Sequence, residues 1–237
     1  PRLVYDAMGA RIINGRSYVM PMPEFSEKYD PENEIDLVVD EWGGWYEVEE
    51  GTNPGFLYQQ NTMRDAMIAG ATLNIFNNYS ERVKMANIAQ TVNVLQAVVL
   101  TEGEKMLLTP TYHVFKMYTV HHDAQLIPVK FESPNYTYQG ESIPAISISA
   151  SKDDAGKTNI SLVNIDAKKD HKVELDLAGM DVKSMAGQIL RSGKIQDHNT
   201  FDNPTKIQIG DFKDFKIKNG KLELSLPPFS VVVLSSK

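Results

Sequence analysis

The sequence of 237 residues contains no cysteine, which removes several kinds of chemistry at once. Without a thiol the chain cannot form a disulfide, bind a metal through thiolates or use a cysteine nucleophile. The five histidines also lack the His-Glu-x-x-His spacing of a zinc site. His113, His121 and His122 fall on a predicted helix near the middle of the chain, and we expect them to be structural. We therefore predict neither a bound metal nor a cofactor.

Positive charge and long apolar runs are scarce as well. The 24 lysines and arginines are outnumbered by 31 acidic residues, and they are scattered along the chain. Because a basic cluster is the usual mark of nucleic-acid binding, we expect no nucleic-acid partner. No run approaches the ~18 apolar residues of a membrane helix, and no signal peptide is visible. We therefore expect a soluble protein of bacterial type, in the cytoplasm rather than secreted, that does not bind membranes.

The first half of the chain alternates between strand and helix patterns. Residues 35–39, Ile-Asp-Leu-Val-Val, are rich in β-branched side chains, as in a strand covered on both faces within a parallel sheet. Apolar residues then recur at helical spacing over 59–79. A second strand is predicted over 82–87 and a second helix over 111–122. This order predicts an α/β part over residues 1–124.

The second half, residues 125–237, contains short runs with a period of two, separated by turn residues. The runs are QLIPVKF (125–131), AISISA (145–150), NISLVNI (159–165), KVELDL (172–177), KIQI (206–209), FKIKNGKLELSL (215–226) and FSVVVLSS (229–236). Asn219-Gly220, between FKIK and KLELSL, is the strongest hairpin signal in the chain. About seven such strands predict an antiparallel β-sandwich.

The stretch EIDLVVDEWGGWYEVEEG, residues 34–51, places a strand directly before two acids and three aromatic residues. Chemistry gathers at the carboxyl ends of parallel strands, and a carboxylate beside aromatic faces suits a sugar. Alternatively, Asp40 and Glu41 only end the strand while Trp42 and Trp45 pack in the core. Glycoside hydrolysis uses two carboxyl groups, ~5–5.5 Å apart in retaining enzymes. Only one such acid stands out here, so both interpretations stay open at this point.

Two amides follow the second predicted strand. Asn87 and Gln90 lie at the end of RVKMANIAQ, the same predicted edge of the sheet as Glu41. Both could therefore reach a ligand beside Glu41. The alternative is that they cap the loop that follows the strand.

Two long segments carry a resemblance to a known family. LVVDEWGGWYEVEEGTNPGFLYQQNTMRDAMIAGATLNIFN and ERVKMANIAQTVNVLQAVVLTEGEKMLLTPTYHVFKMY closely resemble the α-L-arabinofuranosidases of glycoside hydrolase family 51, from about Phe25 to Ala124. The resemblance implies a retaining, oligomeric exo-enzyme that removes terminal α-L-arabinofuranosyl groups from arabinan, arabinoxylan and oligosaccharides. It also implies the C-terminal part of a (β/α)8 barrel over 1–124, followed by a jelly-roll β-sandwich over 125–237.

The resemblance assigns roles to individual residues. The acid of the family's Asp-Glu-Trp motif is the catalytic nucleophile, and it falls on Glu41. The tryptophan four residues later, which lines the sugar site, falls on Trp45, and the glutamine that contacts arabinose falls on Gln90. We expect Asp40 and Asn87 to lie around the carboxylate of Glu41. The implied partner is an arabinose-containing oligosaccharide or polysaccharide.

The chain also departs from the family pattern. The Gly-Asn-Glu motif that carries the family's acid/base is not found, and residues 1–24 do not match. The α/β part is about half of the ~250 residues of a complete barrel. We therefore expect a C-terminal portion that needs the N-terminal barrel portion or other subunits and is inactive alone. The alternatives are a glycosidase of other specificity, such as an endo-glucanase or xylanase, and a non-catalytic carbohydrate-binding or structural fragment.

Overall fold

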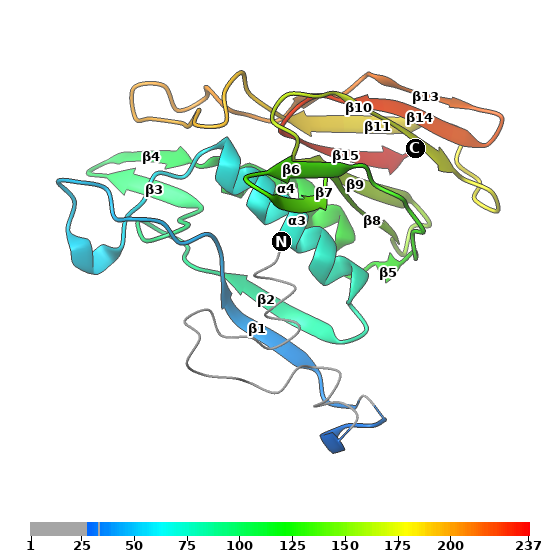
Figure 1. Ribbon diagram of the computed structural model, residues 1–237, viewed down its shortest axis with the longest axis horizontal. Coiled ribbons are helices and arrows are strands. Elements are labelled where there is room, and N and C mark those ends of the chain that lie inside the picture. The colour runs from blue at the N-terminus through cyan, green and yellow to red at the C-terminus, as the bar shows by residue number, and fades with distance from the viewer. Residues whose placement is uncertain (1–27, 33) are drawn as a thin grey trace.

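The computed structural model describes residues 28–32 and 34–237 of the chain. In Figure 1 a pair of strands, β1 and β2, lies on one side of helices α3 and α4, and a larger set of strands lies on the other side. The expectation that residues 1–24 depart from the family lies outside the described residues. No helix in the described part of the chain is long and apolar enough to cross a membrane.

Most of the regular structure is β-strand. The helices that lie wholly within the described residues include η1 (Pro54–Phe56), α3 (Met63–Asn78), α4 (Pro110–Tyr118) and η2 (Thr119–His121). The first four strands are β1 (Leu37–Trp42), β2 (Val83–Ile88), β3 (Val99–Glu102) and β4 (Lys105–Leu108). The remaining strands are β5 (Gln125–Leu126), β6 (Asn135–Tyr138), β7 (Glu141–Pro144), β8 (Ile146–Lys152), β9 (Thr158–Asn164), β10 (His171–Asp176), β11 (Met185–Leu190), β12 (Gly210–Asp211), β13 (Phe215–Lys218), β14 (Lys221–Leu226) and β15 (Ser230–Ser236).

The predicted parallel pairing of the first two strands is confirmed, with shifted bounds. β1 pairs in parallel with β2, and the register joins Val38 to Met85 and Trp42 to Ile88. Because β1 extends to Trp42, Glu41 lies inside the strand rather than after it. The expectation that this strand is covered on both faces is wrong for the described residues, since Val38 is 51% exposed and Met85 is 53% exposed. The pair therefore exposes an apolar patch at Val38 and Met85, which are opposite each other in the register.

Helix α3 begins later than the predicted 59–79, because Thr62 caps its first turn. The Thr62 hydroxyl accepts a hydrogen bond from the backbone of Arg64, and the carboxylate of Asp65 accepts one from the backbone N–H of Thr62, which completes a capping box. The helix then packs closely on the large sheet. A Cβ atom on Gly70 would lie 2.9 Å from a methyl group of Val163, so only glycine fits at this contact.

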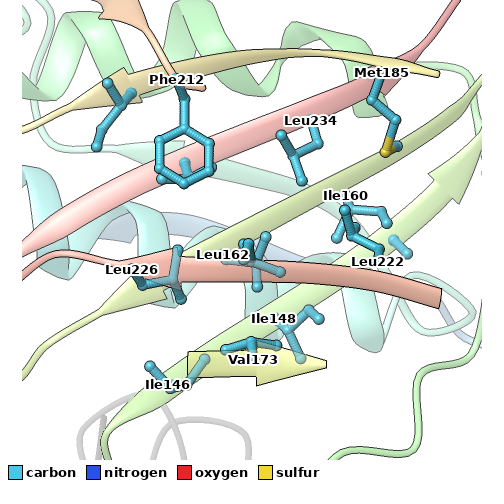
Figure 2. Packing of buried hydrophobic residues seen from close by; sticks show 14 of the residues in the cluster. Ile146, Ile148, Ile160, Leu162, Val173, Met185, Phe212, Leu222, Leu226 and Leu234 are labelled. Carbon is cyan, nitrogen blue, oxygen red and sulfur yellow. The ribbon is translucent and has the colours of Figure 1, made fainter. Parts of the chain in front are cut away.

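The antiparallel sandwich predicted for the second half is confirmed. Its larger sheet has the strand order β12-β11-β15-β9-β8-β5, and its smaller sheet has the order β10-β14-β13. Figure 2 shows the core between them, where Ile148 and Leu162 of the larger sheet meet Val173 and Leu222 of the smaller one. The Asn219-Gly220 turn joins β13 to β14 with positive φ at both residues, as predicted.

Two strand expectations need correction, and two hairpins, β3 with β4 and β6 with β7, were not predicted. Residues 206–209 form no strand, because the backbone N–H of Ile207 donates to the side chain of Asn199 instead of to a neighbouring strand. Only Gln125–Leu126 of the predicted 125–131 pairs as a strand, with β8. The change from helix to strand falls between His121 and Gln125, and the domain division at 124/125 stays a prediction.

The two halves of the chain share a hydrophobic core. Residues of α3 and α4, including Met63, Ala66 and Val114, pack with Val163 of β9 and Val231 of β15 on the face of the larger sheet turned away from the smaller one. Figure 1 shows α3 lying along this sheet. Strand β9 is buried along its whole length, because helices cover one face and the smaller sheet covers the other. The sandwich is therefore not separable from the helices without exposing this core.

We expect the stability of the chain to fall as the pH drops from about 6.5 to 4, because of His121. Its Nδ1 lies 2.7 Å from the hydroxyl of Ser151 on β8, and its Nε2 is enclosed with no hydrogen-bond partner among the described residues. Burial, together with the neighbouring His122, lowers the pKa of His121 to about 4. In this pH range the unfolded chain takes up a proton that the folded chain excludes, which favours unfolding.

This prediction is checked by thermal unfolding between pH 7 and pH 4. His121→Asn keeps a polar atom near the position of Nδ1 but does not titrate, so its melting temperature should depend less on pH over this range. The control is His198→Asn, since the Nδ1 of His198 lies 3.0 Å from the carbonyl of Gln196 in its own loop and not next to the sandwich strands that surround His121. Equal pH dependence in the parent and in His121→Asn would contradict the prediction.

Candidate active site

The site is built on the ends of β1 and β2. Trp42 pairs with Ile88, so Glu41 and Asn87, the residues before them, lie on adjacent strands near the carboxyl ends. The register shifts between Val39 and Trp42, and both Asp40 and Glu41 are exposed. Such irregularities redirect side chains and are common beside active sites. Here the irregularity brings both carboxylates to the surface.

Of the predicted surroundings of Glu41, Asp40 precedes it in β1 and Asn87 lies on the adjacent strand β2. Within the described part of the chain, no hydrogen bond connects the Glu41 carboxylate to Asp40, Trp45, Asn87 or Gln90. All five side chains are exposed. The carboxylate is therefore accessible to a ligand from solvent.

The two tryptophans of the stretch have different environments. Trp42 stacks on Phe115 with ring centres 6.0 Å apart and meets Phe76 edge-on at 5.4 Å. It therefore joins the core, as the packing interpretation expects. Trp45 is 64% exposed, so that interpretation is wrong for Trp45. The Trp45 indole and the Glu41 carboxylate, four residues apart in the chain, are thus both exposed.

The loop that carries Trp45 is held by Gln59, a residue that the sequence did not indicate. The Gln59 side-chain oxygen accepts a hydrogen bond from the backbone N–H of Tyr46 at 2.7 Å, and its amide nitrogen donates to the carbonyl of Gly44 at 2.8 Å. On the other side of the loop, the Arg64 guanidinium lies 3.6 Å from the centre of the Tyr46 ring. Burial raises the pKa of the Tyr46 phenol, while Arg64 opposes the rise, so the phenol stays protonated at neutral pH.

The turn after β2 is held by a second buried amide, Gln96. The Ala89 backbone N–H donates to the carbonyl of Trp42 at 3.0 Å, and the Ala89 carbonyl accepts from the backbone N–H of Gln96 at 3.0 Å. The Gln96 side chain in turn donates to the fully buried Asp65 at 3.1 Å. The peptide bond between Ala89 and Gln90 is cis. Gln90 is thus presented at the surface by a turn whose backbone is fixed on both sides.

Glycine is required where the two strand ends approach each other. Gly43 has φ +153°, and a Cβ atom there would lie 2.7 Å from Cγ of Gln96. A side chain at this position would push Gln96 away from the turn that carries Gln90. Within the described residues, no group of three or more His, Cys, Asp or Glu side chains could hold a metal ion.

Comparison with known proteins identifies the family to which the chain belongs. The model of the α-L-arabinofuranosidase C-terminal domain matches residues 40–230, which is most of the chain. The chain belongs to the α-L-arabinofuranosidase C-terminal domain family. This confirms the resemblance found in the sequence. The match begins at Asp40 and therefore includes Glu41, the Trp45 loop, both helices and most of the sandwich of this α-L-arabinofuranosidase domain.

Individual relatives agree with this α-L-arabinofuranosidase assignment. An intracellular exo-α-L-arabinofuranosidase of Bacteroides ovatus is 43% identical over 209 residues, which are 88% of this chain and 41% of the relative. A GH51 arabinofuranosidase structure from Xanthomonas axonopodis pv. citri matches with a TM-score of 0.88 and 42% identity, covering 91% of this chain and 44% of that one. A family 51 α-L-arabinofuranosidase structure from Bifidobacterium longum matches with a TM-score of 0.76 and 25% identity, covering 85% and 42%. The chain thus spans less than half the length of each relative.

Proposed function

We propose that this chain supplies the nucleophile-bearing part of a retaining α-L-arabinofuranosidase, with Glu41 as the nucleophile. The observation that carries the proposal is the position of Glu41, an exposed carboxylate near the carboxyl end of a parallel strand, beside Asn87 on the next strand. The name of the Bacteroides ovatus relative, 43% identical, supports arabinofuranosyl groups as the substrate. The substrate class is therefore an arabinose-containing oligosaccharide or polysaccharide.

The proposed reaction has two steps. An oxygen lone pair of the Glu41 carboxylate attacks the anomeric carbon of the arabinofuranosyl group. The glycosidic C–O bond breaks as the acid/base residue gives its proton to the leaving oxygen. A water molecule then attacks the anomeric carbon of the ester, loses a proton to the acid/base residue and releases Glu41. The two displacements together return the sugar with its original anomeric configuration.

Side chains near Glu41 have separate proposed roles. The exposed Trp45 indole offers an apolar face against which a furanose ring can pack, and Gln90 offers an amide to the sugar hydroxyls. Asp40 and Asn87 flank the carboxylate on its own strand and on the neighbouring strand. We propose that they bias its orientation once substrate excludes water. The acid/base residue would come from the N-terminal barrel portion or from another subunit.

We propose that β1 and β2 are the last strands of a (β/α)8 barrel over 1–124, followed by a jelly-roll sandwich over 125–237. The apolar face at Val38 and Met85, each about half exposed, supports this, because further barrel strands and their side chains would cover it. The remaining strands would come from an N-terminal barrel portion or from other subunits. The intracellular location in the name of the Bacteroides ovatus relative supports a location inside the cell.

The alternative of a carbohydrate-binding module is less well supported by the packing. Such a module would need a sandwich that folds by itself. Here the larger sheet shares a buried core with α3 and α4, which follow β1 and precede the sandwich in the chain. The relatives named arabinofuranosidases at 43% and 42% identity likewise favour this substrate over a glucan or xylan.

The test compares this chain alone with a chimera in which it follows the upstream part of the Bacteroides ovatus relative. We expect the chimera to release the aryl alcohol from an aryl α-L-arabinofuranoside, and the chain alone to show no turnover above the uncatalysed rate. The same chimera should leave aryl β-xylosides and β-glucosides intact. Full activity of the chain alone, or a folded chimera that prefers another glycoside, would overturn the proposal.

A further inference from the structure

The side chain of Gln59 hydrogen-bonds to the backbone on both sides of Trp45. Gln59 is only 2% exposed. Its two hydrogen bonds reach the N–H of Tyr46 and the carbonyl of Gly44, the residues on either side of Trp45. One side chain therefore satisfies the two backbone groups that flank the indole. We call this pair of bonds the Gln59 clamp.

Trp45 itself is mostly exposed to solvent. It is 64% exposed, and within the described part of the chain its ring stacks on no other ring and on no cation. The hydrogen bonds that Gln59 makes to the backbone on either side therefore constrain the position of this residue. After Trp45 the chain runs as an irregular loop to η1. The two ends of this loop are joined by a hydrogen bond from the backbone N–H of Glu49 to the carbonyl of Tyr58 at 2.9 Å.

The clamp is anchored in the rigid part of the molecule. Gln59, Asn61 and Thr62 form a polar segment that is buried directly before α3. Asn61 bonds to the hydroxyl of Thr111 on α4 at 2.8 Å, and Thr62 caps α3. Buried amides are costly unless they are satisfied, so each of these side chains has a specific backbone or hydroxyl partner. Gln59 is the member of this segment whose partners lie in the Trp45 loop.

We propose that Gln59 is a positioning residue, which fixes the Trp45 loop so that the indole is preset as a wall beside Glu41. The role of the wall in sugar binding rests on the proposed function, whereas the clamp itself does not. A preset indole loses less conformational freedom when a ligand packs against it, and this saving strengthens binding.

The clamp is tested on the chain itself by replacing its two tryptophans with 5-fluorotryptophan and recording ¹⁹F spectra. Trp45→Phe assigns the two signals. Gln59→Glu retains the acceptor for Tyr46 and loses the donor to Gly44, while Gln59→Leu loses both. We expect the Trp45 signal to shift in Gln59→Glu and to shift further in Gln59→Leu, while the Trp42 signal stays in place.

The matched control is Asn61→Leu. Asn61 is also a buried amide, two residues away, and its bonds go to Thr111 and to the carbonyl of Ala97 rather than to the Trp45 loop. A merely structural role for Gln59 predicts that Asn61→Leu moves the Trp45 signal as much as the Gln59 variants do, and that result would overturn the proposal. An unchanged Trp45 signal in folded Gln59→Glu would overturn it as well.

The consequence for binding is measured in the chimera with the aryl arabinofuranoside. We expect Gln59→Glu to raise KM up to about tenfold, because ordering one side chain on binding costs roughly that much affinity. The value of kcat should change less, since Glu41 is untouched. A chimera without arabinofuranosidase activity would count against the proposed function, whereas the two fluorine signals judge the clamp independently.

Discussion

In the active chimera, Glu41→Gly is expected to lower kcat for the aryl arabinofuranoside by on the order of 10⁴-fold or more, since loss of a nucleophile removes the covalent route. The protein should remain folded, because Glu41 is exposed and makes no hydrogen bond within the described part of the chain. The change removes the attacking oxygen and leaves a small space on the same side of the sugar. The rate is measured from release of the aryl alcohol under saturating substrate.

Azide then distinguishes a nucleophile from an acid/base residue. In the Glu41→Gly variant, azide can enter the vacated space and attack the anomeric carbon opposite the leaving group. The product would be β-L-arabinofuranosyl azide, with inverted configuration, identified by NMR. Glu47→Gln is the control, because Glu47 is an exposed acid in the loop after β1 and has no proposed role. An α-configured azide product, or equal losses in both variants, would contradict the assignment of Glu41.

Local sequence predicted those elements whose signals are themselves local. The hairpin of β13 and β14 follows from Asn219-Gly220, which adopt the positive φ angles that such a turn requires. Helix α3 follows from its apolar spacing, and its start is set by Thr62. The strand predicted at 206–209 does not form, because a contact outside the local sequence takes its hydrogen bond. Ile207 has the right alternation, but a side chain eight residues away, Asn199, takes its backbone N–H.

The end of β1 shows how tertiary contacts extend an element beyond its sequence pattern. The apolar run stops at Val39, yet the strand continues to Trp42. Trp42 packs between Phe76 of α3 and Phe115 of α4, which draws the two acids into the paired region. Phe76 and Phe115 are far from Trp42 in the chain, so the local sequence does not reveal that they pack on it. Glu41 therefore appeared to follow the strand, although it lies within it.

The sequence indicated the exposed residues of the candidate site but not the buried residues that hold its loops. Glu41, Trp45 and Gln90 were indicated by their places after two predicted strands, and the family resemblance then assigned their roles. The family is confirmed, while the roles stay proposals. Gln59 and Gln96 were missed. Their partners lie 13 to 15 and 31 residues away in the chain, so no local pattern distinguishes them from surface glutamines. Only the fold shows that these amides are buried and which groups they bind.

The largest effect on stability is expected at Asn74, inside the contact between α3 and the sandwich. Its side-chain oxygen accepts hydrogen bonds from Tyr118 at 3.0 Å, Ser149 at 3.0 Å and Ser161 at 2.6 Å, and its amide nitrogen donates to Ser147 at 3.1 Å. Asn74→Ala removes all four bonds and leaves a cavity. The free energy of unfolding should fall by about 3 kcal/mol, which is measured by urea denaturation followed by circular dichroism.

Asn77→Ala provides the comparison on the same helix. Asn77 also reaches the sandwich, but through one bond, to Ser149 at 3.1 Å, and its side chain is half-buried. Its removal should cost about 1 kcal/mol or less. Because Trp42 packs on Phe76 of α3, its fluorescence in a Trp45→Phe background reports the helix side, whereas amide NMR signals of β10 and β14 report the smaller sheet of the sandwich. If Asn74 joins the two parts into one unit, both signals shift together in Asn74→Ala. Separate transitions, or equal effects of the two substitutions, would show that the helices and the sandwich are stabilised independently.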